Sequence, residues 1–442
     1  MSRPSGKPQV RRRHVFYMSG FDPKGPAHYH RMYTDEAALA GEVGGYRAEV
    51  GKRRKLSNHS AGWQVHYQGG ATEAAAEVST EVEFLRWDDI VRDHWPRHPG
   101  VLAADLVRTT RLYLRTGALW RMFTLSWPPV VALVVPFLIL LALVLALPLA
   151  LLAGGWLGHS LNTGGYGAPL AWLAGATAAA ALFGAAFAGA RLAEQRLNMQ
   201  WLLRSYAFTG RQGTSGWPVL ETRLDAFALA ITQRVSLAAQ ARDPAAAHAA
   251  GTACDEVLIV AHSSGSIMAV SALARAMVLD PQLTQRGPQV SLLTLGHWTP
   301  LLSSLPSASQ FRTELDRLAR DPALDWVDFT APPDGCCFAL TDPITAAGLP
   351  AAARPDHPRL LSPRFASLFS PTRYASIKRD RFHLHFQYLM ASELPGDYDY
   401  TAITAGPLTL GARFASQPSV TDFAQFRPFQ RQPPSTRHGP SR

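Results

Sequence analysis

The chain has 442 residues, of which 47% are hydrophobic and 17% are charged. It is long enough for more than one domain and too apolar to be intrinsically disordered as a whole. Its net charge is +10, and nine of these charges lie in two tails, residues 1–13 and residues 427–442. The body between the tails is nearly neutral, so it lacks the extended basic surface of a nucleic-acid-binding protein.

The two basic tails have two interpretations, and the sequence leaves both open. They suit the anionic cytoplasmic surface of a membrane, or they are disordered and solvated ends of the chain. The cysteines Cys254, Cys336 and Cys337 have neither the even count of a disulfide framework nor the C-x-x-C spacing of a zinc site. We therefore expect the soluble part of the chain in a reducing compartment.

Three strands are predicted in the first hundred residues. His14–Met18 is a short β-branched and aromatic run that ends in the turn Ser19–Pro23. The runs Trp63–Tyr67 and Val82–Trp87 have a similar composition. We predict that residues 14–100 form the first part of an α/β domain.

Residues 101–125 are predicted to form an amphipathic juxtamembrane helix. In this segment, apolar residues such as Leu106 and Tyr113 are interleaved with Arg108 and Arg115. Such a helix could lie in the headgroup plane of a membrane, or it could pack on the soluble domain. The sequence favours neither interpretation.

A transmembrane hairpin is predicted over residues 126–192, because no charged residue lies between Arg121 and Arg191. Val130–Leu152 is 23 residues long, which corresponds to a helix of about 34 Å. This length is enough for a hydrocarbon core of about 30 Å. Pro169–Ala190 is a second apolar run, rich in Ala and Gly. The alternative is a pair of helices buried in a large soluble core.

Small residues in the second run are expected to let the two helices pack closely. These residues are Ala180, Gly184, Ala188 and Gly189. Arginines flank the hairpin on both sides, whereas the connection between the two runs has none. The positive-inside rule therefore places both termini and the soluble domain in the cytoplasm. We expect a location in a bacterial inner membrane, with the lipid bilayer as a partner.

The rest of the chain, residues 193–426, is predicted to form the second part of the same domain. Helices and strands alternate along it, which is typical of an α/β fold with a mostly parallel sheet flanked by helices. The expected helices are Leu220–Ala241, Ile267–Leu279 and Ser307–Arg320. The expected strands are Glu256–Val260, Val290–Leu295 and Trp326–Thr330.

The segment Ala261–Ser266 joins a buried strand to a helix and has the sequence AHSSGS. It resembles the nucleophile elbow of the α/β-hydrolase superfamily, which includes lipase- and esterase-like serine hydrolases. The elbow requires small residues two positions before and after the serine. Ser263 meets this requirement with Ala261 and Gly265, whereas Ser264 does not. Ala261 replaces the glycine that the family most often has there.

The resemblance implies a serine, an acid and a histidine in this order along the chain. Asp334 follows a predicted strand on a Pro-Gly turn and is the expected acid. Asp342 lies on a second turn and is the alternative. Asp328 is less suitable because it falls inside the predicted strand.

The resemblance also implies a catalytic histidine. His385 stands in an H-x-x-Y context with Tyr388 and is the expected base. His383 would lie on the same side of an extended run, so it is the alternative. His262 is adjacent to the serine, and at that place in the turn its side chain would point away from the hydroxyl.

Two backbone N–H groups are implied as oxyanion donors. One belongs to Ser264, directly after the nucleophile, and the other to Phe21 in the turn after the first strand. Ser19–Gly20–Phe21 resembles the H-G-F-type segment of the family, with Ser19 in place of the histidine.

The sequence thus predicts a membrane-anchored serine hydrolase that cleaves an ester, such as a lipid acyl ester, through an acyl-enzyme and without a metal or organic cofactor. One alternative is a membrane scaffold that keeps the hydrolase fold without catalysis. Another is an acyltransferase or thioesterase with the same triad. The sequence makes no prediction of oligomeric state.

Overall fold

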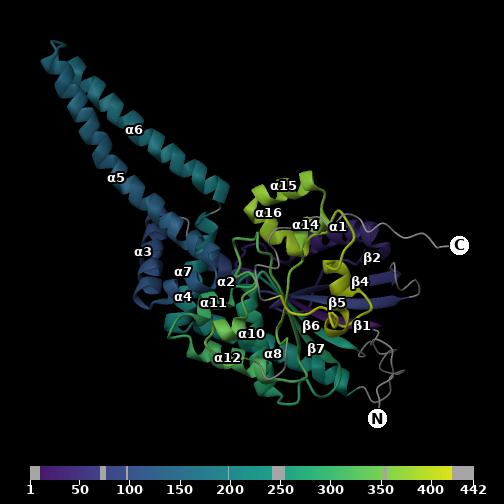
Figure 1. Cartoon of the computed structure of the whole chain (residues 1–442). Helices are drawn as coiled ribbons and strands as arrows, with labels where there is room; N and C mark the ends of the chain where they lie inside the picture. Colours follow the sequence, from purple (N-terminus) through teal and green to yellow (C-terminus); the bar gives the residue numbers. More distant parts are fainter. Residues whose placement is uncertain are drawn as a thin grey trace.

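The computed structural model describes residues 10–69, 76–95, 98–197, 199–240, 254–351 and 356–420. The predicted basic tail at residues 427–442 and most of the predicted N-terminal tail lie outside the described residues. Within them, a nine-stranded mixed sheet is flanked by helices, and two long apolar helices project from this α/β body (Figure 1).

The sheet is mostly parallel, as predicted. Its strands lie in the order β2-β4-β5-β1-β6-β7-β8-β9, and β3 pairs with β4. From β5 to β9 the neighbours are parallel, whereas β4 is antiparallel to β2, β3 and β5. The strands are β1 Arg12–Met18, β2 Tyr46–Val50, β3 Arg54–Lys55, β4 Ser60–Gly69, β5 Glu77–Leu85, β6 Glu256–His262, β7 Gln289–Leu295, β8 Asp325–Phe329 and β9 Arg359–Leu361.

Strand β1 begins at Arg12, so Arg12 and Arg13, which were assigned to the N-terminal tail at residues 1–13, belong to the sheet instead. Arg13 is buried and its Nε donates to the Glu256 carboxylate at 2.7 Å. Its other guanidinium nitrogens donate to the carbonyls of Gly406 and Leu408. A buried guanidinium is tolerated when all its donors are paired. This contact fixes the C-terminal part of the described chain against the amino end of β1.

Helices cover both faces of the sheet and bury two hydrophobic clusters. The first face carries α8 (Pro218–Ala239), α10 (Gly265–Leu279) and α12 (Ser309–Arg320), close to their predicted bounds. The second face carries α1 (Pro26–Gly44), α16 (Arg381–Phe386) and α17 (Tyr400–Ala405), which the sequence analysis did not predict. The short elements are α2 Asp88–Asp93, α11 Thr299–Ser303, α13 Pro343–Ala346, α14 Phe365–Leu368, α15 Pro371–Arg379, η1 Gln387–Leu389 and α18 Leu410–Arg413.

The two projecting helices are α5 (Trp127–Thr163) and α6 (Ala168–Leu197). Both are long and apolar enough to cross a membrane, and the most apolar stretches of α5 and α6 are only 12% and 17% buried. A helix pair in the centre of a soluble core would be mostly buried, so this alternative does not hold. The predicted connection, residues 153–168, is largely helical, and only residues 164–167 form the turn.

The helices approach each other at glycines other than the predicted ones. A Cβ added to Gly154 would lie 2.3 Å from the Gly175 carbonyl oxygen, and one on Gly158 would lie 2.8 Å from the Trp172 ring. An added Cβ on Gly184 or Gly189 would meet nothing within 4 Å. The prediction that Gly184 and Gly189 mediate close packing is therefore wrong. The close contact lies near the connecting turn, and the helices diverge toward the α/β body (Figure 1).

The predicted juxtamembrane helix is two helices, α3 (Pro99–Arg115) and α4 (Ala118–Leu125). The break is at Gly117, whose φ of 71° favours glycine. Tyr113 of α3 is buried, and its hydroxyl donates to the Leu301 carbonyl at 3.1 Å. This helix therefore packs on the α/β body. Helix α7 (Met199–Ser215) follows α6 and packs beside α3.

Candidate active site

Ser263 lies in the tight turn between β6 and α10 and has a φ of 57°. This left-handed conformation costs a residue with a side chain about 1–3 kcal/mol, and such residues cluster at functional sites. The turn is packed closely against the end of β1. A Cβ added to Gly265 would lie 2.5 Å from the Met18 carbonyl oxygen, and one on Gly20 would lie 2.9 Å from the Ser263 Cβ. Only glycine fits at these two positions.

Ser263, after β6, and His385, from α16, lie at the same edge of the sheet, beside the carboxyl end of β7. The Ser263 N–H donates to the Leu295 carbonyl at the end of β7, at 2.8 Å. Gly296 follows with a φ of 57°. A Cβ added to it would lie 3.4 Å from the His385 Cε1 and 3.5 Å from the Asp334 Oδ2. All three predicted triad positions thus lie around the turn that follows β7.

Asp334 is buried and hydrogen-bonded to His385. Its Oδ2 accepts from the His385 Nδ1 at 2.8 Å and from the Tyr388 hydroxyl at 3.1 Å. Its Oδ1 accepts from the Cys336 N–H at 2.9 Å. Burial raises the pKa of Asp334, but the electrostatic interaction with the His385 ring and the hydrogen bonds from His385 and the Cys336 N–H outweigh burial, so the pKa lies below its ordinary value. The carboxylate is therefore ionised and orients the imidazole.

The other aspartates have different roles. Asp342, the alternative acid, is the N-cap of α13 and accepts from the Ile344 N–H at 2.9 Å. Asp328 lies inside β8 and accepts from the Thr294 hydroxyl, and burial raises its pKa well above the ordinary value. Neither forms a hydrogen bond with His385 among the described residues.

His385 lies on α16, where the sequence analysis expected an extended run. Residues two apart on a helix point in nearly opposite directions, because each residue turns the chain by about 100°. His383 is consequently half-buried and turned away, whereas His385 is fully buried. The structure therefore separates these two histidines instead of placing them on one side.

The remaining ring nitrogen of His385, Nε2, is buried and has no hydrogen-bond partner in the part of the chain that the structure describes. Ser263 is 2% exposed, but no hydrogen bond joins its hydroxyl to this nitrogen. Catalytic hydrogen bonds of this kind are often formed only with substrate bound. The geometry leaves Nε2 free to take a proton.

His262 supports the backbone of His385. Its Nε2 donates to the His385 carbonyl at 2.8 Å. Burial, reinforced by the neighbouring imidazole of His385, lowers the pKa of His262 to about 3. The ring is therefore neutral at physiological pH.

The two predicted oxyanion donors differ in whether their N–H group already has an acceptor. The Phe21 N–H donates to the Ser264 hydroxyl at 2.7 Å, so it is already occupied. For the Ser264 N–H, no acceptor is found among the described residues. An oxyanion could be bound by the Ser264 N–H at once, but by the Phe21 N–H only after the Ser264 side chain rotates.

Trp201 lies against the candidate site, although no sequence pattern predicted it there. Its indole N–H donates to the Phe21 carbonyl at 2.7 Å, and its ring lies edge-on to His385 with 6.1 Å between centroids. It also contacts Phe382 at 5.1 Å. Trp201 is near the start of α7 and belongs to no motif, so only the fold reveals its place.

Comparison of the chain with protein-family models, with curated proteins and with solved structures finds no match. Among the described residues, no three His, Cys, Asp or Glu side chains lie close enough together to hold a metal ion.

Proposed function

We propose that this chain is a membrane-anchored serine hydrolase of the α/β-hydrolase type that cleaves ester bonds. One observation carries the proposal. Ser263, held at positive φ between a strand and a helix, lies at the same sheet edge as a buried Asp334–His385 hydrogen bond. This combination of a strained serine, an oriented imidazole and an unoccupied Nε2 is the arrangement that nucleophilic catalysis needs.

In the proposed mechanism, the Nε2 of His385 takes the hydroxyl proton of Ser263 as the oxygen attacks the ester carbonyl. Asp334 stabilises the imidazolium that forms. The Ser264 N–H stabilises the oxyanion. His385 then gives the proton to the leaving alcohol, which departs and leaves an acyl-serine. Water, deprotonated by the same nitrogen, hydrolyses the acyl-enzyme and restores Ser263.

The membrane anchor of the proposal is the hairpin α5–α6. Aromatic side chains are exposed at its base, with Trp120 at 70%, Phe123 at 47% and Trp127 at 61%. Tryptophan is enriched where membrane helices meet the headgroups. These residues support placing the base of the hairpin at the membrane interface and the α/β body on the cytoplasmic side.

A second candidate function is a scaffold that keeps the fold without catalysis. The occupied Phe21 N–H and the absence of a hydrogen bond from Ser263 to His385 favour it. An acyltransferase or thioesterase would use the same residues and differs only in the acceptor or the leaving group.

Labelling of the full chain in detergent with a fluorophosphonate probe tests the proposal. We expect labelling of the wild type and none of Ser263→Ala. Asp334→Asn should slow labelling by about 10⁴-fold, because the imidazole is held in the wrong tautomer. The matched controls are Asp342→Asn and His383→Gln, which should label at the wild-type rate. Equal labelling of Ser263→Ala and the wild type excludes this nucleophile, and a folded wild type that resists the probe favours the scaffold.

A further inference from the structure

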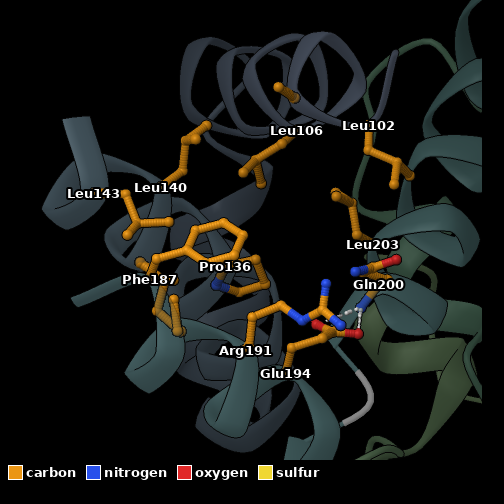
Figure 2. A pocket seen from close by; sticks show the side chains of 13 residues that line it. Leu102, Leu106, Pro136, Leu140, Leu143, Phe187, Arg191, Glu194, Gln200 and Leu203 are labelled. Carbon is orange, nitrogen blue, oxygen red and sulfur yellow. Dashed lines mark hydrogen bonds between the residues drawn. The ribbon is translucent and has the colours of Figure 1, made fainter. Parts of the chain in front are cut away.

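A cavity of about 260 Å³ lies at the base of the apolar hairpin, between α3, α5, α6 and α7 (Figure 2). Its volume lies just below the range of ligand-binding pockets, which begins at about 300 Å³. Its lining is mostly aliphatic and aromatic: Leu102, Ala103, Leu106, Pro136, Ile139, Leu140, Leu143, Phe187, Ala190 and Leu203. Ordered water needs several polar partners, which these apolar side chains do not supply. The cavity therefore suits an apolar ligand.

The divergence of the two hairpin helices explains the cavity. Gly154 and Gly175 bring the backbones together near the connecting turn, whereas Gly189 faces open space. Toward the α/β body the gap widens, and the side chains of Leu140, Leu143 and Phe187 face into it (Figure 2). The space is thus bounded by the same apolar surface that would face lipid.

One edge of the cavity is polar. Arg191, Glu194 and Gln200 lie together there (Figure 2). The Glu194 carboxylate accepts from the Gln200 N–H at 3.2 Å. Arg191 is exposed and forms no ion pair with any residue that the structure describes. It is the first charged residue after the apolar run of α6, at the depth where phosphate headgroups would lie.

We propose that this cavity binds an acyl chain of a bilayer phospholipid, with the lipid phosphate at Arg191. The inference rests on the membrane location proposed above, but it concerns a ligand other than the ester cleaved at Ser263. Gln200 and Leu203 of α7 line the cavity, whereas Trp201, between them, contacts Phe21 and His385. Helix α7 therefore separates the lipid site from the candidate active site.

The proposal is tested with the full chain in vesicles of phosphatidylcholine and phosphatidylglycerol that contain a phosphatidylglycerol with a diazirine on its acyl chain. After irradiation, cross-linked peptides are mapped by mass spectrometry. Leu106 and Leu203 are 3% and 6% exposed, so cross-links there require a chain inside the cavity. Cross-links at Leu149 and Leu152, which are 64% and 70% exposed on α5, report contact with bulk lipid.

Leu140→Trp fills the cavity and should reduce cross-linking at Leu106 and Leu203 by about tenfold, equivalent to about 1.4 kcal/mol of binding free energy. Ala103→Phe fills it from α3 and should do the same. The matched control, Leu152→Trp, adds the same ring outside the cavity and should leave these cross-links unchanged. Arg191→Gln should weaken them, because the phosphate loses its cation.

The outcomes separate the two proposals. Cross-links at Leu149 and Leu152 without any at Leu106 and Leu203 overturn the lipid site and leave the membrane anchor in place. An absence of cross-links on both α5 and α6 overturns the membrane location and the lipid site together. A cross-link between two copies of the chain at the cavity lining assigns the cavity to a dimer contact instead. None of these readouts depends on hydrolysis at Ser263.

Discussion

The Ser264 hydroxyl competes for a predicted oxyanion donor. It accepts the Phe21 N–H at 2.7 Å, so the donor is released only when this bond breaks. A neutral hydrogen bond contributes about 0.5–1.5 kcal/mol net. We therefore predict that Ser264→Ala, which removes the competing acceptor, raises kcat for a soluble p-nitrophenyl ester by up to about tenfold.

The opposite result would assign the hydroxyl itself to the reaction. If Ser264→Ala lowers kcat by about 10²–10³, the size expected for a lost oxyanion donor, then the Ser264 hydroxyl is the donor. Ser309→Ala is the control, because Ser309 is exposed at the start of α12, away from the site. It should leave kcat unchanged.

Buried neutral histidines make the stability of the fold depend on pH. Burial lowers the pKa of His262 to about 3 and that of His297 to about 4, whereas the unfolded pKa is about 6.5. Between these values the unfolded chain binds more protons, so the free energy of unfolding falls as pH falls. Each histidine contributes a loss of about 1.4 kcal/mol per pH unit below about pH 6.5.

We predict a lower melting temperature at pH 5 than at pH 7 for the full chain in detergent, measured by tryptophan fluorescence. His262→Gln should flatten this dependence, because glutamine stays neutral and can donate to the His385 carbonyl. His383→Gln, on the half-buried side of α16, serves as the control and should keep the wild-type slope. An unchanged slope in His262→Gln would contradict the assignment.

Among the helices and strands, those with a clear hydrophobic pattern could be predicted from the sequence. Strands β6 and β7 and helix α10 match their predicted ranges closely, because a short apolar run and a helical period are strong signals. Helix α16 was mistaken for an extended run. Its six residues are too few to show a period, and its start is set by Asp380, which caps the N–H groups of Phe382 and His383.

The hairpin was predicted as an element, but its packing was not. The apolar composition is enough to predict two long helices. The face of α6 that contacts α5 depends also on where the turn between them begins. Helix α5 runs to Thr163, eleven residues beyond the predicted end, and this shifts the contact to Gly154 and Gly175. Small residues on both helices offered several ways to pack, and sequence alone does not choose among them.

At the scale of the whole molecule, the candidate site joins residues that are far apart in the chain. The resemblance to a known family predicted Phe21, Ser263, Asp334 and His385, because each of them lies in a recognisable turn or short sequence motif. Trp201 lies in no such motif. It reaches the site because α6 ends at Leu197 and α7 begins at Met199, so α7 leads directly from the hairpin to the site.

This route predicts that the hairpin influences the site through Trp201. Its indole N–H donates to the Phe21 carbonyl, so a bilayer that fixes the hairpin should also fix the turn that holds Phe21, the predicted oxyanion donor. We expect the wild type to react with a fluorophosphonate about fivefold faster in vesicles than in detergent, a coupling at the low end of those known between sites. In Trp201→Ala the two rates should become equal, since the connecting side chain is gone. The control is Trp156→Ala, which removes a 72% exposed ring from α5 and should keep the wild-type ratio of the vesicle rate to the detergent rate. If Trp201→Ala also kept the wild-type ratio, α7 would not carry the coupling.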